Sequence, residues 1–273
     1  LCNYQSVFFL GGINQDFIQH LFQIGALLKH YLNYRNRQGI NIMKHNNKLI
    51  TLYGKEYFKG RLGDDIKRQR SFDEEKKFIN KYVSMEGSIL DVGCSTGEFL
   101  KYIKWSGRKY GIEISQFAAE KARQNGINIV NTYDANNSLD VVIYRGTIQH
   151  LDSPFRSLEK AVQALKPGGY IFFIATPNIN SIYYKIFNTL PALDCDRNFY
   201  LPSDRSLTQL GNIFNLEIVG VEYPYINSPY SNPIVDYCKF LYKLLLLPFG
   251  KFGESVEFSF HGNMMNMSFR KKG

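Results

Sequence analysis

The stretch Ser88-Ile89-Leu90-Asp91-Val92-Gly93-Cys94-Ser95-Thr96-Gly97-Glu98 is the most informative part of the chain. Its first five residues form a short apolar run of the kind found in buried strands. Gly93 and Gly97 bracket the turn that follows, where a backbone without side chains lets a ligand approach closely. A helix over 97–106 is expected next, and its free N-terminal amides would suit an anionic or carboxylate-bearing group. The pattern predicts a strand, a turn and a helix that together bind a nucleotide-like cofactor.

A second strand, expected over 109–112, leads directly into Glu113. Glu113 follows Asp91 by 22 residues, near the spacing at which an acidic residue binds ribose hydroxyls in nucleotide-binding βαβ units. Ser95 stands where a dinucleotide-binding turn would carry its second glycine, which disfavours NAD. Gly97 is followed by Glu98 rather than by lysine and a hydroxyl residue, which disfavours an ATP-binding phosphate loop.

Four motifs resemble those of class I S-adenosylmethionine-dependent methyltransferases and occur in the same order. Residues 90–99, Leu-Asp-Val-Gly-Cys-Ser-Thr-Gly-Glu-Phe, resemble the first motif of that family, and residues 110–115 resemble its second strand. Residues 140–151 resemble the fourth strand and the turn after it, and residues 164–171 resemble the lead into the fifth strand. The resemblance implies methyl transfer with S-adenosylmethionine as cofactor.

The family resemblance also implies the fold class, which is α/β. A doubly wound, mostly parallel, seven-stranded Rossmann-like sheet is expected, with N-terminal helices and a C-terminal insertion that forms a cap. We expect helices over 73–83, 182–190 and 206–214, a fifth strand over 169–175, and a final antiparallel pair over 215–223 and 263–270. The expected parts are an N-terminal extension (1–42), a helical cap (43–84), the cofactor-binding core (85–223), an insertion or lid (224–257) and a final strand with a basic tail (258–273). The first methionine is Met43, so residues 1–42 are interpreted as an upstream extension, with an amphipathic partner-docking helix as the alternative.

The resemblance further implies the residues of the cofactor site. Glu113 would hold both ribose hydroxyls, Arg145 would orient the loop or the cofactor, and Tyr53 or Tyr57 would lie near the methionine end, although core packing explains these tyrosines equally well. The adenine-contacting residue is left open between Tyr133 and Asp134. The predicted cofactor-binding residues are Asp91, Gly93, Cys94, Ser95, Thr96, Gly97, Glu113, Ile114 and Arg145.

The candidate catalytic residues follow the fourth strand. His150 would take the proton of an acceptor hydroxyl, because the turn after that strand faces the cofactor in this family; a structural histidine is the alternative. Asp152 is the second candidate, and His261 would approach the cleft from the final hairpin. No cluster of carboxylates suggests a metal-assisted reaction, so no metal site is expected.

Composition narrows the classes of partner. The chain has 273 residues and a net charge of +9, but its longest block of basic residues is 270–272, so nucleic acid is not favoured. Four cysteines without a Cys-x-x-Cys pair suggest neither a zinc site nor a disulfide framework. The protein is therefore expected in the cytoplasm, where part of it would contact the inner face of the membrane peripherally.

The acceptor is expected from the C-terminal third. Residues 199–202, 222–225 and 261–263 resemble a subset of the family associated with sugars and cell-envelope polysaccharides, so a sugar hydroxyl on a nucleotide sugar or glycan is the leading acceptor. A tRNA or protein methyltransferase and a non-catalytic binding module are the alternatives. The apolar window within 239–251, which is too short to span a bilayer, would touch a membrane or lipid-linked acceptor, or else form a buried lid or homodimer helix.

Overall fold

The structure is a computed structural model that describes residues 53, 57, 58, 66–133, 138–193, 197–226, 228, 231–246, 248 and 258–273. The predictions for residues 1–42 and for Asp134 lie outside the described residues.

A seven-stranded sheet forms the centre of the described chain, in the order β3-β2-β1-β4-β5-β7-β6. All neighbouring pairs from β3 to β5 are parallel, whereas β7 runs antiparallel to both β5 and β6. This confirms the predicted fold class and the antiparallel strand pair at one edge. The strands are β1 Ile89–Val92, β2 Lys109–Ile112, β3 Asn128–Ile129, β4 Leu139–Arg145, β5 Leu165–Pro177, β6 Leu216–Glu222 and β7 Met264–Lys271.

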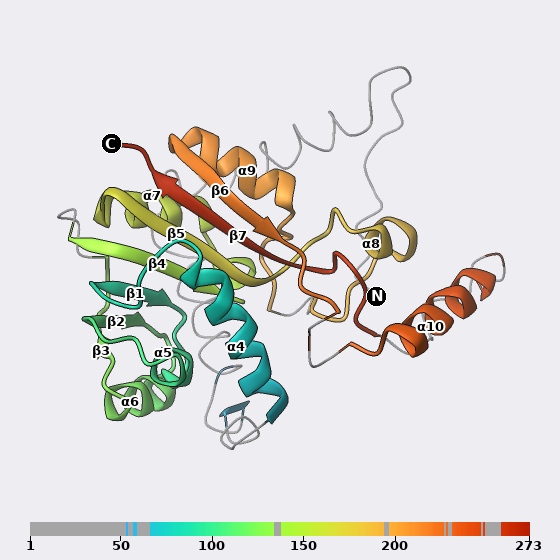
Figure 1. Ribbon diagram of the computed structural model, residues 1–273, viewed down its shortest axis with the longest axis horizontal. Helices are drawn as coiled ribbons and strands as arrows, with labels where there is room; N and C mark the ends of the chain where they lie inside the picture. Colours follow the sequence, from blue (N-terminus) through green and yellow to red (C-terminus); the bar gives the residue numbers. More distant parts are fainter. Residues whose placement is uncertain are drawn as a thin grey trace, which may run out of the picture.

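Helices cover both faces of the sheet (Figure 1). Side chains of β4 and β5 alternate between the faces: Tyr144 and Phe173 pack with α7 and α9, whereas Ile143 and Phe172 pack with α4, α5 and α6. Burial on both faces explains why these strands read as continuous apolar runs in the sequence. The helices are α4 Ile66–Asn80, α5 Glu98–Tyr102, α6 Gln116–Gln124, the 3₁₀ helix η1 Ile148–His150, α7 Pro154–Ala164, α8 Ile182–Phe187, α9 Asp204–Ile213 and α10 Pro233–Leu246.

Several element ends differ from those predicted. Helix α5 ends at Tyr102 rather than at residue 106, because Lys104 adopts a left-handed φ of 57° and turns Trp105 into the core. Helix α8 stops at Phe187, where Asn188 takes a φ of 52°. Helix α4 begins seven residues before the predicted start, and these roughly two added turns carry Arg68, which pairs with Glu98 of α5.

The insertion between β6 and β7 contains α10, which packs beside α8. Tyr183 and Phe187 of α8 form an apolar cluster with Phe258 and Phe260, and Phe240 of α10 packs against it. No helix in the described ranges has the length and apolar character needed to cross a membrane.

Candidate functional site

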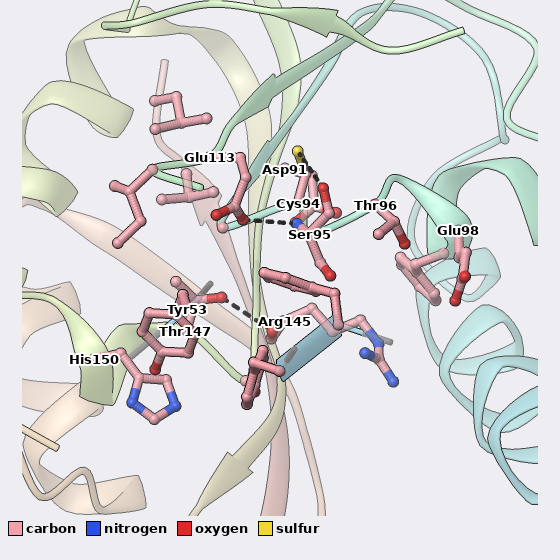
Figure 2. A pocket seen from close by; sticks show the side chains of 18 of the residues that line it. Tyr53, Asp91, Cys94, Ser95, Thr96, Glu98, Glu113, Arg145, Thr147 and His150 are labelled. Carbon is pink, nitrogen blue, oxygen red and sulfur yellow. Dashed lines mark hydrogen bonds between the residues drawn. The ribbon is translucent and has the colours of Figure 1, made fainter. Parts of the chain in front are cut away.

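A cavity of about 280 Å³ opens at the carboxyl ends of β1, β2 and β4 (Figure 2). In open α/β sheets this edge is where ligands bind, because the strand order reverses there and the loops diverge. Here β1 pairs with β2 on one side and with β4 on the other, so the loop after β1 lies at that reversal. The glycine-rich turn predicted from the sequence is this loop.

The turn after β1 has a strained backbone that brings it against the end of β4. Gly93 and Ser95 have φ angles of 75° and 53°, in the left-handed region that favours glycine. A Cβ on Gly93 would lie 2.6 Å from Cγ2 of Thr147, which follows β4. Ser95 adopts this left-handed conformation although it has a side chain, and its backbone N–H donates a hydrogen bond to Glu113 over 3.0 Å. Glycine is thus required at 93 for close approach, whereas the serine at 95 is held by the acidic residue after β2.

Replacing Gly93 with alanine should destabilise the protein more than the same change at Gly126. Both glycines have φ near +75 to +80°, so both variants incur a left-handed penalty of about 1–2 kcal/mol. Gly126 has open space around its Cα, whereas Gly93 faces Thr147. Urea denaturation measures the free energy of unfolding of both variants. Because both carry the same backbone strain, the difference between their losses reports the steric clash at Gly93. Equal losses would show that the turn is not tightly packed against Thr147.

Glu113 connects the turn to the next helix. Its Oε2 accepts a hydrogen bond from the Ser95 N–H, and its Oε1 accepts one from the Ser115 N–H over 2.8 Å. Burial raises the pKa of Glu113, and the backbone N–H groups of Ser115 and Ser95 partly oppose that rise. Each carboxylate oxygen keeps a further lone pair and faces the cavity, so Glu113 can accept two hydroxyl groups of a ligand.

Asp91 also lines the cavity and is almost fully buried, with 2% of its surface exposed. Its Oδ1 has no hydrogen-bond partner among the described residues. Burial raises its pKa to about 7, and the nearby Arg145 charge limits the rise. A buried carboxylate oxygen without a partner is costly, so this position suits a ligand that brings a cationic donor.

Arg145 lines the cavity, but its guanidinium is committed to α4. Nε and Nη2 donate to the two carboxylate oxygens of Glu75 over 2.5 and 3.0 Å. The guanidinium carbon also lies 4.6 Å from the Phe72 ring centroid and 5.1 Å from that of Phe99. The structure therefore assigns Arg145 mainly to holding α4 against the sheet. Sequence reasoning missed Glu75, because it lies 70 residues from its partner and no local pattern marks it.

His150 lines the cavity beside Tyr53, with the two ring centroids 6.2 Å apart. The amide nitrogen of Gln149 lies 3.0 Å from the Gly146 carbonyl, which can only accept, and 3.2 Å from His150 Nε2. His150 Nε2 is then the acceptor, and Nδ1 donates to the Arg197 carbonyl over 3.1 Å. The imidazole is held with its proton on Nδ1, so it acts as a base only when Nε2 exchanges the Gln149 amide for an acceptor hydroxyl.

Other predicted residues lie away from the cavity lining. Asp152 is exposed, because the chain turns outward there to begin α7 at Pro154. His261 is exposed and lies 6.3 Å from the ring centroid of Tyr225. Tyr133 forms a hydroxyl network with Tyr144 and Ser157 in the core. The cavity lining among the described residues therefore does not include Asp152, His261, Tyr133 or Gly97, and their predicted roles stay predictions.

Aromatic side chains bound the cavity opposite the sheet. Tyr53 and Tyr57 pack edge to face with ring centroids 5.0 Å apart, and both line the cavity with Phe58. The Arg197 guanidinium carbon lies 4.8 Å from the Tyr57 ring centroid and 5.7 Å from that of Tyr53. The predicted position of these tyrosines at the cofactor cleft agrees with this lining.

The lining fits S-adenosylmethionine. Glu113 would hold the ribose hydroxyls, and the unpartnered Oδ1 of Asp91 would hold the methionine ammonium. Ile114, which is 52% exposed, offers an apolar surface for the adenine. Cys94, Ser95 and Thr96 complete the turn around the ligand. In the part of the chain that the structure describes, no group of three histidine, cysteine, aspartate or glutamate side chains could hold a metal ion.

Comparison with known proteins agrees with this chemistry. Residues 55–221 match the family model of a methyltransferase domain. A ubiquinone biosynthesis O-methyltransferase from Coxiella burnetii is 28% identical over 172 residues, which cover 54% of this chain and 72% of that protein.

Two solved structures share the fold. An S-adenosylmethionine-dependent methyltransferase from Thermotoga maritima has a TM-score of 0.55 and 20% identity, covering 84% of this chain and 99% of that one. The 1,6-didemethyltoxoflavin-N1-methyltransferase from Burkholderia thailandensis, solved with S-adenosylhomocysteine, also has a TM-score of 0.55, with 13% identity and coverage of 87% and 93%. The family match spans more than half of this chain and includes the turn, Glu113 and the β4 loop. The chain belongs to the methyltransferase domain family, and it is an S-adenosylmethionine-dependent methyltransferase.

Proposed function

We propose that the enzyme methylates a hydroxyl group of a small acceptor, with a sugar hydroxyl as the first acceptor class to test. The observation that carries the proposal is that Tyr53, Tyr57 and His150 line the same cavity as Asp91 and Glu113. An aromatic surface and a hydrogen-bonding imidazole beside the residues predicted to bind the cofactor support this proposal. Aromatic faces suit stacking on a ring-shaped acceptor.

The name of one relative supports the type of bond formed. The Coxiella burnetii protein is named a ubiquinone biosynthesis O-methyltransferase, which favours oxygen as the methylated atom. It also makes a phenolic hydroxyl the second acceptor class. The two classes differ in the acidity of the hydroxyl, because a sugar hydroxyl needs more help with its proton than a phenol does.

The residues of this chain would act mainly by positioning. S-adenosylmethionine, when bound, supplies a methyl group activated by the attached sulfonium. Glu113 and Asp91 fix the cofactor from two sides, and the tyrosines close the cavity against water. His150 Nε2 accepts the acceptor's hydroxyl proton as the Gln149 amide is released, while Nδ1 keeps its hydrogen bond to the Arg197 carbonyl.

The lining does not favour a tRNA substrate. Two arginines line the cavity, and both are paired: Arg68 with Glu98 over 3.0 Å and Arg145 with Glu75. Their charge is neutralised locally, so the described lining lacks the basic track that a nucleic-acid backbone needs.

An acceptor screen tests the proposal, together with two histidine variants, one at His150 and one control at His261. Wild-type enzyme is incubated with S-adenosylmethionine and either nucleotide sugars or catechols, and S-adenosylhomocysteine formation is measured. His150→Asn should lower kcat by about 100-fold with the true acceptor, whereas the exposed control His261→Asn should leave it unchanged. Turnover with catechols alone would move the acceptor to the phenolic class. Cofactor binding without methylation of any hydroxyl compound would contradict O-methylation.

Cofactor affinity should depend on pH through Asp91. Its pKa in the ligand-free protein is about 7, and pairing with the ligand ammonium requires the charged form. The affinity for S-adenosylhomocysteine should therefore rise by about tenfold between pH 6 and pH 8. Asp91→Asn should bind more weakly and without this pH dependence.

The same raised pKa has an opposite effect on the ligand-free fold. Neutral Asp91 stabilises the folded state at low pH, and this contribution is lost as the pH rises through about 7.

Calorimetric titrations of S-adenosylhomocysteine at several pH values check the predicted rise in cofactor affinity. A wild-type affinity that is constant over this range would show that Asp91 does not pair with the ligand.

A further inference from the structure

Helix α10 buries two charged side chains and leaves several aliphatic side chains exposed, unlike an ordinary surface helix. Its acidic residue Asp236 and one of its two lysines, Lys243, are buried, with 4% and 2% of their surfaces exposed. Its aliphatic residues Ile234, Leu241 and Leu245 are 80%, 59% and 71% exposed. A helix of a globular protein normally turns its apolar stripe inward and its charges toward water.

The buried charges fix this orientation. Lys243 Nζ donates to the Tyr183 hydroxyl over 3.0 Å and lies 4.8 Å from the ring centroid of Phe187. Asp236 Oδ2 accepts from the Tyr225 hydroxyl over 3.0 Å and from the Asn232 N–H over 2.7 Å. Rotating α10 to bury Leu241 and Leu245 would break the contacts of Lys243 with α8 and of Asp236 with Tyr225, so this face is held outward.

The outward face forms one continuous stripe. Ile234, Leu241 and Leu245 follow one another at spacings that place them on the same side of a helix. Tyr237 and Tyr242 flank the stripe and are 51% and 61% exposed. Tyrosine has an apolar ring and a polar hydroxyl, which suits the boundary between lipid and water.

Within the described residues of α8 and α10, the charged side chains that reach solvent are basic. Asp236 is the only acidic residue in α8 and α10, and it is buried. The other charged side chains of the two helices that reach solvent are Lys185, which is exposed, and Lys239, which is half-buried. An apolar stripe with tyrosines and lysines beside it matches the composition of helices that lie in the surface of an anionic bilayer.

We propose that α10 docks this face on an anionic lipid surface. With 14 residues the helix is about 21 Å long, shorter than the roughly 30 Å hydrocarbon core, so it would lie along the surface. Figure 1 shows α10 projecting from one side of the molecule, beside α8 and beyond the end of β5. Because β5 is parallel to β4, it ends at the same edge of the sheet where the cavity opens. Docking through α10 would therefore take place at the edge of the sheet where the cavity opens.

Vesicle sedimentation of the full chain tests the proposal. Vesicles of phosphatidylcholine are compared with vesicles that also contain phosphatidylglycerol, and the bound fraction is measured. Wild type should bind the anionic vesicles, and Leu241→Ser/Leu245→Ser should lower the partition coefficient by at least about tenfold. Lys239→Glu should weaken binding to anionic vesicles only. The matched control is Ile213→Ser on α9, which removes an equally exposed aliphatic residue and should bind as wild type does.

Three outcomes would overturn the proposal. The first is that wild type does not sediment with anionic vesicles. The second is that the α9 control loses as much binding as the α10 variant. The third is that wild type is a dimer without lipid and the α10 variant is a monomer, as measured by analytical ultracentrifugation. The last result would assign the face to a second copy of the chain. Unchanged S-adenosylhomocysteine binding by each variant shows that it is folded. Vesicle binding requires no acceptor, so this result is separate from that of the proposed O-methylation.

Discussion

Replacing Glu113 with alanine is expected to weaken S-adenosylhomocysteine binding by at least about 100-fold. The carboxylate would accept both ribose hydroxyls, and losing two hydrogen bonds to a charged group costs about 3 kcal/mol, or two decades in the dissociation constant. The loss should be larger than that, because Ser95 and Ser115 also lose the acceptor of their backbone N–H groups. The turn that shapes the cavity would then lose one of its attachments.

Isothermal titration calorimetry measures this loss of affinity. Two further variants show whether the loss comes from the Glu113 carboxylate itself. Glu120→Ala removes an exposed carboxylate from the helix that follows and should bind the ligand as wild type does. Glu113→Gln keeps an oxygen acceptor without the charge, so its affinity should fall between those of wild type and the alanine variant. Unaltered affinity in Glu113→Ala would exclude this residue from the ribose site.

Replacing Glu75 with alanine is expected to destabilise the protein by about 3–5 kcal/mol. Glu75 is buried and accepts two hydrogen bonds from Arg145, so its removal takes the carboxylate partner from a partly buried guanidinium beside Phe72 and Phe99. Helix α4 would lose its main polar attachment to β4. Urea denaturation followed by circular dichroism measures the free energy of unfolding.

The neighbouring residue provides the control. Glu74 pairs with Lys77 at the surface, so Glu74→Ala should produce no measurable change. Removing both partners in Glu75→Ala/Arg145→Met should recover part of the loss, because no uncompensated charge remains. A loss of stability no larger than that of Glu74→Ala would contradict the structural role assigned to the pair.

Local sequence patterns predicted the strand and the turn that line the cavity. The strand, the turn and Glu113 are specified by residues close in the chain, and the structure places Gly93, Ser95 and Glu113 in direct contact or in the same lining. The turn needs positive φ, and glycine records that requirement in the sequence.

Long-range partners could not be predicted in the same way. Arg145 was expected to orient the loop or the cofactor, but its partner Glu75 comes from a helix far away in the chain. Tyr133 was a candidate for the adenine, yet its hydroxyl is taken by Ser157 and Tyr144. Such pairings depend on which helix lies over which strand, and a single sequence does not carry that information.

The insertion shows the same limit. The apolar window around α10 fits both a buried lid and a membrane contact, because periodicity does not tell which side of a helix faces the protein. The structure distinguishes the sides by burying Lys243 beside Tyr183 and leaving Leu241 and Leu245 exposed. The direction of the helix is set by contacts with α8, which lies about 50 residues earlier in the chain.

A crystal structure of the complex with S-adenosylhomocysteine would test the assignment of the cavity most directly. The ribose hydroxyls should lie within hydrogen-bond distance of Glu113, and the ligand ammonium should lie against the otherwise unpartnered Oδ1 of Asp91. Density for the ligand at another place on the sheet, or a ribose that does not contact Glu113, would contradict the assignment of this cavity as the cofactor site.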